Sequence, residues 1–178
     1  LETSGLDYII LRPRALIGRG DTVIMPRLIR AYREGKLRVI GDGNNLADLT
    51  CVSNVVRAVE CAMKAPNEAL GSAYNISNGS PVRLWPTINS MLTDLGFVSV
   101  KKHVPVRVAM LAAWLMEKKS ILSGYTEPAL TRYSVGVLSY SMTLDISQAR
   151  KLLGYKPVQT TEEGIREFVD WYHAQQDD

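Results

Sequence analysis

Residues 1–21, LETSGLDYIILRPRALIGRGD, contain the stretch that decides the fold of this 178-residue chain. Within them, Leu6–Leu11 is a short apolar run, which is typical of a strand buried inside a sheet. Pro13 is expected to break the strand, and the charged, glycine-containing stretch up to Asp21 predicts a loop. An inner strand needs a neighbour on each side, so the sequence raises the question of which other strand completes the sheet.

Strand and helix patterns alternate through the first half of the chain. A helix is predicted over residues 23–34, with Pro26 in its first turn, where a missing N–H costs little. Short strands are predicted over 36–40, 46–52 and 73–77. This alternation favours a parallel sheet flanked by helices.

A second helix is predicted over residues 54–65, where Ser53 can cap the first turn. Apolar residues recur at helical spacing along one side of it, as is typical of a face that packs on a core. These residues are Val55, Val56, Val59 and Met63.

From Pro86 onward the chain is mainly helical in pattern. Asp145 is a candidate N-cap for one helix, and Thr160 or Thr161 for the last, which has two glutamates in its first turn. The predicted helices cover residues 87–95, 106–118, 146–153 and 162–175.

Charge and cysteine content exclude several classes of protein. The net charge is only +3, and no cluster of Lys and Arg is dense enough to follow a phosphate backbone, so nucleic-acid binding is not predicted. Cys51 and Cys61 lie among apolar neighbours, which predicts core thiols in a reducing, cytoplasmic compartment. Residues 1–21 do not have the pattern of a signal peptide.

The longest apolar run covers residues 108–116, VAMLAAWLM. It is too short to cross a membrane, which takes about 20 residues. It can form a buried helix, the wall of an apolar pocket, or a helix that lies on a membrane surface. We expect burial or pocket lining, and do not expect contact with a membrane surface.

No catalytic or metal-binding pattern stands out. Glycine-rich nucleotide loops are absent, and His103 and His173 lack metal ligands at suitable spacing, so no metal site is predicted. Tyr32 and Lys36 match a Tyr-x-x-x-Lys spacing, but Gly35 stands where the helix should be ending. We therefore assign no catalytic residue.

Four ordered stretches resemble one family. They are SGLDYIILRPRALIGRGD, KLRVIGDGNNLADLTCVSNVVRAVECAM, AYNISNGSPV and LDISQARKLLGYKPVQTTEEGIREFVDWY. Together they are similar to the carboxy-terminal half of an extended short-chain dehydrogenase/reductase, of the NAD(P)-dependent epimerase/dehydratase group.

The resemblance implies an α/β fold. Residues 1–85 would form the carboxy-terminal part of a Rossmann-type parallel sheet, mixed with substrate-region segments, and residues 86–178 a small, mostly helical substrate-binding part. In this family the glycine-rich turn and the catalytic Ser, Tyr and Lys precede the "LRP" strand. The resemblance therefore implies that the amino-terminal half is absent, and that these residues alone bind NAD or NADP weakly and are inactive.

The resemblance also implies two sets of site residues. The loop after the "LRP" strand would contact the nicotinamide of the cofactor, through Pro13, Arg14, Ala15 and Leu16. The small-molecule substrate would be contacted by Ile24, Met25, Pro26, Val39, Ile40 and Asp48.

Departures from the family pattern bear on the substrate. Nucleotide-sugar enzymes of the family carry Arg-Asp where this chain has Ala47-Asp48, and that arginine binds a phosphate, which alanine cannot do. Asn54 and the apolar helix look like the 3β-hydroxysteroid dehydrogenase-like branch, which acts on bulky apolar alcohols. Two alternatives remain: a nucleotide-sugar epimerase/dehydratase and a non-catalytic regulatory module. Association of copies through the strand edge at Tyr8–Leu11 is a further expectation.

Overall fold

In the computed structural model, which describes residues 5–124 and 128–175, the chain forms two compact units. Unit 1 contains residues 1–28, 48–82 and 143–178, and unit 2 contains residues 29–47 and 83–142. Each unit is therefore built from segments that are distant in the sequence. The functional roles expected for 1–85 and 86–178 stay predictions.

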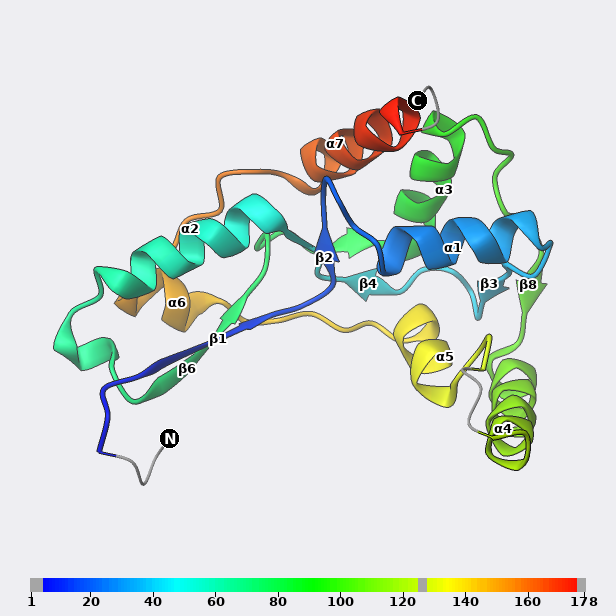
Figure 1. The fold of residues 1–178 in the computed structure, drawn as a ribbon, viewed down its shortest axis with the longest axis horizontal. Coiled ribbons are helices and arrows are strands. Elements are labelled where there is room, and N and C mark those ends of the chain that lie inside the picture. Colours follow the sequence, from blue (N-terminus) through cyan, green and yellow to red (C-terminus); the bar gives the residue numbers. More distant parts are fainter. Residues whose placement is uncertain (1–4, 125–127, 176–178) are drawn as a thin grey trace. The chain divides into compact units, whose positions relative to one another are not determined.

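Unit 1 is organised around a parallel pair of strands, β1 (Ile9–Pro13) and β6 (Ser72–Ile76), seen side by side in Figure 1. The register places Pro13 opposite Ile76, so both strands end at the same level. The predicted strand is confirmed, but it starts at Ile9 and includes Pro13, because a proline is tolerated at the end of a strand. Among the described residues, the other edge of β1 has no partner strand.

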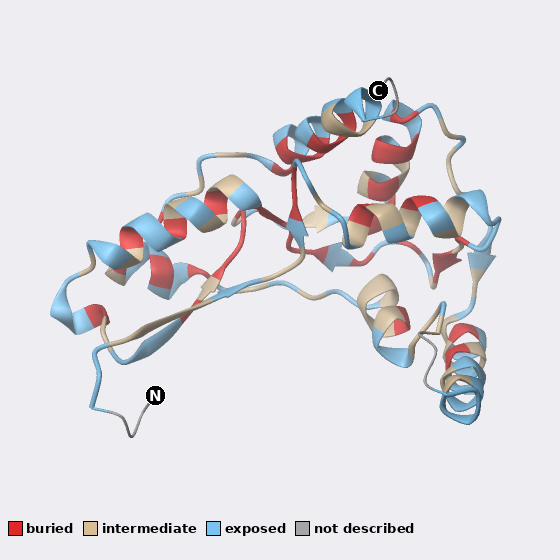
Figure 2. Cartoon of the chain, in the orientation of Figure 1, coloured by how far each residue is buried: buried red, intermediate tan, exposed pale blue. Residues whose placement is uncertain are grey.

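Helices cover this pair of strands. Helix α2 (Val52–Met63) packs against β1 and β6, and α6 (Ser147–Leu152) packs against β6, with the short 3₁₀ helix η1 (Asn67–Ala69) leading into β6. The core between them is coloured red in Figure 2. It consists of Ala58, Cys61, Ala69, Tyr74, Ile76, Ile146, Ala149, Leu153 and Tyr155.

Tyr155 makes the stability of this core sensitive to alkaline pH. Its hydroxyl is buried and donates a hydrogen bond to the Ser77 carbonyl at 2.9 Å, and burial raises the pKa of Tyr155 from 10.0 to about 12. The unfolded chain ionises first, so the stabilisation is complete below pH 10.0 and is lost as pH rises to about 12. Urea unfolding across this range should show the loss, and Tyr155→Phe should reduce it. An equal loss in the variant would contradict this assignment.

A second parallel pair in unit 1 joins β2 (Leu16–Ile17) to β5 (Thr50–Cys51). Helix α7 (Thr161–Ala174) packs on both strands. As predicted, Thr160 caps this helix: its side chain accepts from the Glu163 N–H, and the Glu163 carboxylate accepts from the Thr160 N–H.

Unit 2 is mainly helical. It contains α3 (Leu84–Asp94), α4 (Val106–Leu122), α5 (Arg132–Ser139) and the second half of α1 (Ile24–Arg33). Its strands are short: β3 (Val39–Ile40) pairs in parallel with β8 (His103–Val104), while β4 (Leu46–Ala47) bridges to Met142 and pairs with β7 (Val82–Arg83). Trp85 is buried in this unit and donates from Nε1 to the Leu138 carbonyl at 2.8 Å.

Several local predictions are wrong. The single strand expected over 46–52 is divided into β4 and β5, and α5 was not predicted. Ser53 does not cap α2, because its hydroxyl bonds to the Gln159 side chain and the N-cap is Cys51. Asp145 accepts from the Ser147 N–H at 2.8 Å, but the N-cap of α6 is Ile146.

The apolar face predicted for α2 does not pack inward. Val56, Val59 and Met63 are exposed, and Val55 is half-buried. The buried face instead carries Asn54, Ala58 and Cys61. Small side chains let the helix approach the strands closely, and the Asn54 amide finds hydrogen-bond partners there.

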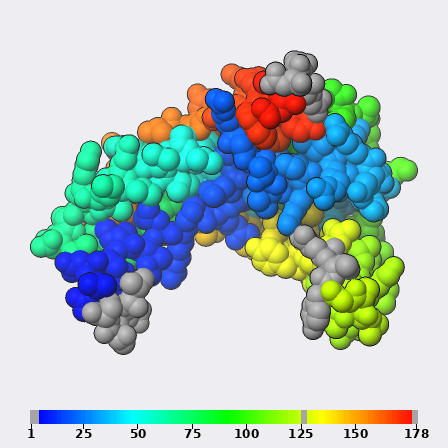
Figure 3. Space-filling view, in the orientation of Figure 1, coloured from blue at the N-terminus to red at the C-terminus, as the bar shows by residue number. Residues whose placement is uncertain are grey.

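Burial of the apolar stretch 108–116 is also contradicted for most of its side chains. In α4 only Ala109 and Ala113 are buried, and this helix packs against α5. Alanines permit close helix approach and leave the larger side chains outside. Figure 3 shows α4, in yellow-green, at the surface of unit 2.

Candidate functional site

The turn Pro13–Leu16 follows directly from the carboxyl end of β1, the end at which open parallel sheets bind ligands. Pro13 and Leu16 are exposed, whereas Arg14 and Ala15 are half-buried. Ala15 has a φ of 48°, the left-handed conformation, and is the one non-glycine with positive φ among the described residues. That conformation costs an alanine about 1 kcal/mol, so neighbouring groups must hold it.

Thr50 of β5 holds this turn. Its hydroxyl donates to the Arg14 carbonyl at 2.5 Å and accepts from the Arg14 N–H at 3.4 Å. Its backbone N–H donates to the Ala15 carbonyl at 3.0 Å. The peptide groups on both sides of Ala15 are thus fixed. The Thr50 side chain holds the one before Ala15, and the Thr50 backbone N–H holds the one after it. No local sequence signal indicates this role, because Thr50 lies 36 residues from Arg14.

Replacing Thr50 with valine should loosen the turn. Valine keeps the shape but leaves the Arg14 carbonyl without its donor, at a cost of about 1–3 kcal/mol in the free energy of unfolding. Hydrogen exchange at Arg14–Leu16 should accelerate, read by mass spectrometry. Thr93→Val is the matched control, since Thr93 lies in α3 and its exposed hydroxyl bonds to the Asn89 carbonyl at 2.9 Å and to the Ser99 hydroxyl at 3.5 Å, away from the turn. Unchanged exchange at the turn in Thr50→Val would contradict the role.

A buried network of polar side chains, centred on Asn78, lies just after the carboxyl end of β6. Asn78 accepts from the Cys51 N–H at 2.9 Å and from the Asn54 amide at 2.6 Å, and it donates to the Thr161 hydroxyl at 3.0 Å. The Asn78 N–H donates to the Leu49 carbonyl at 3.1 Å. These bonds join β5, the start of α2 and the start of α7, so the strand ends that carry the turn are rigidly supported.

Cys51 takes a structural part in this network. Its thiol bonds to the Thr160 carbonyl and to the Asn78 amide, each at 3.2 Å. Burial raises the pKa of the Cys51 thiol, so the sulfur stays protonated at neutral pH. Both cysteines are buried free thiols, as predicted.

The predicted substrate residues fall in both units. In unit 1, Met25 is buried and Ile24 and Pro26 are half-buried at the start of α1. Asp21 caps this helix by accepting from the N–H groups of residues 23–25 at 2.7–3.0 Å.

The other predicted substrate residues are buried. Asp48 in unit 1 is fully buried, and its Oδ2 accepts from the Leu144 N–H at 2.6 Å, which gives it a structural part. Val39 and Ile40 belong to the core of unit 2. Contact of any of these residues with a substrate stays a prediction.

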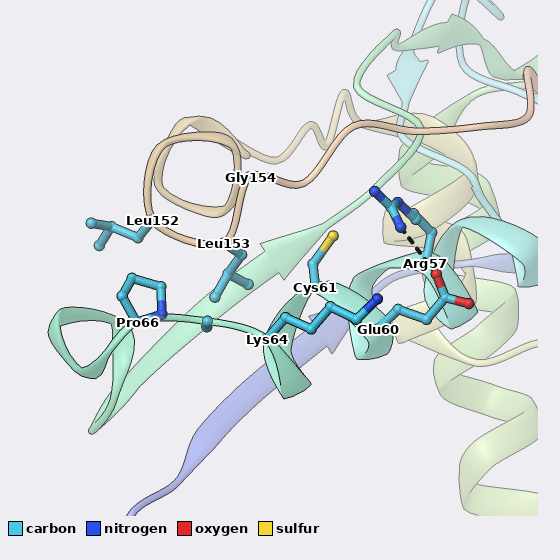
Figure 4. Close-up of a pocket in the computed structure, with 9 residues that line it drawn as sticks. Arg57, Glu60, Cys61, Lys64, Pro66, Leu152, Leu153 and Gly154 are labelled. Carbon is cyan, nitrogen blue, oxygen red and sulfur yellow. Dashed lines mark hydrogen bonds and ion pairs between the residues drawn. The ribbon is translucent and has the colours of Figure 1, made fainter.

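A separate cavity of about 310 Å³ lies in unit 1 between the end of α2 and α6 (Figure 4). Arg57 and Glu60 form an ion pair at 3.1 Å on its rim, beside Cys61 and Lys64. Helix α2 runs back toward the start of β6, so this cavity lies near the amino ends of the strands. That is the edge at which parallel sheets rarely bind cofactors.

Over residues 5–124 and 128–175, no group of three or more His, Cys, Asp or Glu side chains is placed to hold a metal ion. Within the same ranges, no helix has the length and apolarity needed to cross a membrane.

Parallel strands covered by helices, with a supported turn at the strand ends, define an α/β protein of Rossmann type. Solved structures share this fold. UDP-glucuronic acid 4-epimerase from Bacillus cereus aligns with a TM-score of 0.61 at 20% identity, over 93% of this chain and 44% of that chain. UDP-glucose 4-epimerase from Thermotoga maritima aligns with a TM-score of 0.62 at 21% identity, over 97% and 48%.

Residues 1–77 match the NAD dependent epimerase/dehydratase family, which confirms the resemblance seen in the sequence. The chain is 38% identical to 3beta-hydroxysteroid-dehydrogenase/decarboxylase isoform 2 of Arabidopsis thaliana, over 94% of this chain and 32% of the relative. It is 31% identical to sterol-4-alpha-carboxylate 3-dehydrogenase, decarboxylating, of Mus musculus, over 92% and 47%. It is 35% identical to 2-alkyl-3-oxoalkanoate reductase of Stenotrophomonas maltophilia, over 92% and 51%.

The chain thus spans between about a third and a half of the length of these curated relatives.

Proposed function

We propose that these residues form the substrate-binding part of an NAD(P)-dependent oxidoreductase that acts on a hydroxyl-bearing, hydrophobic, sterol-like substrate. The observation that carries the proposal is the turn Pro13–Leu16, held in a strained conformation at the carboxyl end of a parallel strand. Strain that is fixed by dedicated hydrogen bonds is typical of functional sites.

The turn suits a nicotinamide ring. Pro13 and Leu16, the first and last residues of the turn, have exposed apolar side chains. These side chains offer a surface against which a flat ring can pack. A bound nicotinamide dinucleotide supplies the hydride acceptor. The chain's own part is to position it: Thr50 fixes the turn, and Pro13 and Leu16 exclude water from the ring face. We assign proton transfer to no side chain among these residues.

A hydrophobic substrate is favoured over a nucleotide sugar by position 47. Ala47 is buried and is bridged to Met142 through the backbone, so this position offers no cation to a phosphate. The names of the relatives point the same way, since two are sterol or hydroxysteroid dehydrogenases. The nucleotide-sugar enzymes align only at the level of fold.

The test uses the full-length protein and follows the absorbance of reduced nicotinamide. We expect turnover with a 3β-hydroxysteroid, with or without a 4-carboxylate, and none with UDP-glucose. Thr50→Val should raise the KM for the cofactor about fivefold or more, as expected for a loss of about 1 kcal/mol in cofactor binding, whereas Thr93→Val should not. Conversion of UDP-glucose alone would favour the epimerase alternative instead. This conversion is followed by chromatography of the sugar nucleotides, because an epimerisation returns the hydride to the sugar and leaves no net reduced nicotinamide.

Calorimetry with NAD and NADP separates the enzyme from the regulatory module. The full-length protein should bind one of them and reduce it in the presence of substrate. Binding without turnover of any substrate class would favour a non-catalytic module. Micromolar binding by the 178-residue chain alone would contradict the expectation that the main dinucleotide contacts come from elsewhere.

A further inference from the structure

Helix α2 carries an apolar stripe, and four of its five side chains are exposed, by 44% to 82%. Starting from Val52, the members recur after three, four, seven and eleven residues, the spacing of a helix face that is normally buried. At about 100° per residue they fall in a sector of about 100°, and the charged residues of the helix, Arg57 and Glu60, lie outside it. We call this set the α2 stripe: Val52, Val55, Val56, Val59 and Met63.

The polar flank of α2 already has a neighbour. Arg57 and Glu60 line two cavities, of about 310 and 390 Å³, between this flank and residues 152–158, and Figure 4 shows the first of them. Helix α6 packs on β6, and the Tyr155 hydroxyl donates to the Ser77 carbonyl just after β6. Residues 152–158 therefore lie on the β6 side of α2. Because the buried face of the helix lies between its two flanks, the α2 stripe faces outward on the β1 side.

The β1 side of this layer is open. Among residues 5–124 and 128–175, no strand pairs with the outer edge of β1, and Ile9–Leu11 are only half-buried although all three are apolar. Backbone N–H and C=O groups at a sheet edge need partners, and both faces of a complete parallel sheet are covered. The curated relatives are about two to three times as long as the part that this chain matches. The full-length protein can therefore supply a further parallel strand beside β1.

The handedness of strand connections places a helix beside the α2 stripe. Connections between parallel strands of one sheet are right-handed in about 98% of cases, and α2 lies in the connection from β1 to β6. A strand that precedes β1 and pairs with its outer edge continues the same order across the sheet. The helix that connects it to β1 then lies on the same face as α2 and next to it. We propose that, in the full-length protein, this helix packs on the α2 stripe and the strand before it pairs with β1.

The occupant is an amphipathic helix with its apolar face toward α2. Packed helices approach to about 8–10 Å, and the contact removes the four exposed side chains of the stripe from water. A second copy of the chain seated on the stripe would cover these side chains too, but it would leave the edge of β1 unpaired. A strand followed by a helix covers both at once. This contact does not depend on the substrate proposed above.

Cysteine alkylation of the full-length protein tests the contact without reading activity. Val59→Cys places a thiol in the α2 stripe, and Glu60→Cys, the matched control, places one on the polar flank. Both positions are exposed among the described residues, and the native Cys51 and Cys61 are buried. Val59→Cys should react with iodoacetamide at least about tenfold more slowly than Glu60→Cys, because a covered thiol reacts only when the helices separate. Equal rates would overturn the proposal, and so would protection that is lost on dilution, which would identify a second copy.

Photo-crosslinking identifies the segment that covers the stripe. Met63→Cys, labelled with a benzophenone maleimide, places the probe at the most exposed position of the stripe, so the fold should survive, as judged by circular dichroism. Mass spectrometry should find a crosslink, within one molecule, to a peptide that precedes residue 1. Val158→Cys is the control, because Val158 is 63% exposed beside the polar flank, where no such crosslink is expected. A Met63→Cys probe that finds no peptide before residue 1, whether it crosslinks within residues 1–178, to a second molecule or not at all, would overturn the proposal.

Discussion

Asn54→Leu should lower the free energy of unfolding by about 3–5 kcal/mol, the largest effect that we expect from a polar residue of this chain. The Asn54 side chain is fully buried and makes four hydrogen bonds. Its Oδ1 accepts from the N–H groups of Val158 and Gln159 at 2.7 and 3.0 Å. Its Nδ2 donates to the Gln159 carbonyl at 2.7 Å and to the Asn78 side chain at 2.6 Å. Leucine has a similar volume but leaves these groups without partners.

Urea unfolding measures this loss, with an unchanged slope if both variants unfold in two states. Asn75→Leu is the matched control, because the half-buried Asn75 side chain makes one long hydrogen bond, of 3.3 Å, to the Asp145 carbonyl. It should change the free energy by no more than about 0.5 kcal/mol. A loss below about 1 kcal/mol for Asn54→Leu would show that the network is not a main source of stability.

Gly164→Ala should lower the free energy of unfolding by about 3 kcal/mol through overpacking. Gly164 lies in α7 where a Cβ would stand 2.5 Å from the Cys51 sulfur. Cys51 is fully buried and is held by the Asn78 network, so it cannot move aside cheaply. Gly136→Ala is the control: Gly136 is also helical, but no atom lies within 4 Å of its added methyl, so that change should be neutral or slightly stabilising.

A double-mutant cycle identifies the cause of the loss. In a Cys51→Ala background the nearest atoms to the new methyl are at 3.4 Å and 3.6 Å, which are ordinary contacts. Gly164→Ala should then cost less than about 1 kcal/mol, giving a coupling energy of about 2 kcal/mol between the two positions. Additive effects of the two substitutions would show that the sulfur is not what the methyl meets.

The sequence predicted the elements whose signals are local. The apolar run that overlaps β1, the helical periodicity of α2 and the Thr160–Glu163 cap of α7 are each formed by residues only a few positions apart. Helix α5 has a local signal too: Thr131 caps it by accepting from the Ser134 N–H at 3.0 Å, so this threonine could have indicated the helix.

What could not be predicted depends on distant partners. Periodicity in the sequence shows that α2 has an apolar side. It does not show that the side carrying Asn54 is the buried one, because the hydrogen-bond partners of Asn54 lie 24 to 105 residues away. The same holds for the candidate site. Its turn was placed correctly at the end of β1, but the residue that holds it was missed, since a threonine in a short strand has many ordinary uses.

The dependence of a left-handed alanine on Thr50 has a consequence for anyone who exchanges segments between relatives. Residues 13–16 do not keep their conformation when they are transferred alone, because hydrogen bonds from Thr50 hold part of that conformation. A chimera that receives this turn alone should inherit the residues without the conformation, whereas moving position 50 along with it should restore both. We therefore expect the residues of the turn and the residue at position 50 to covary among relatives.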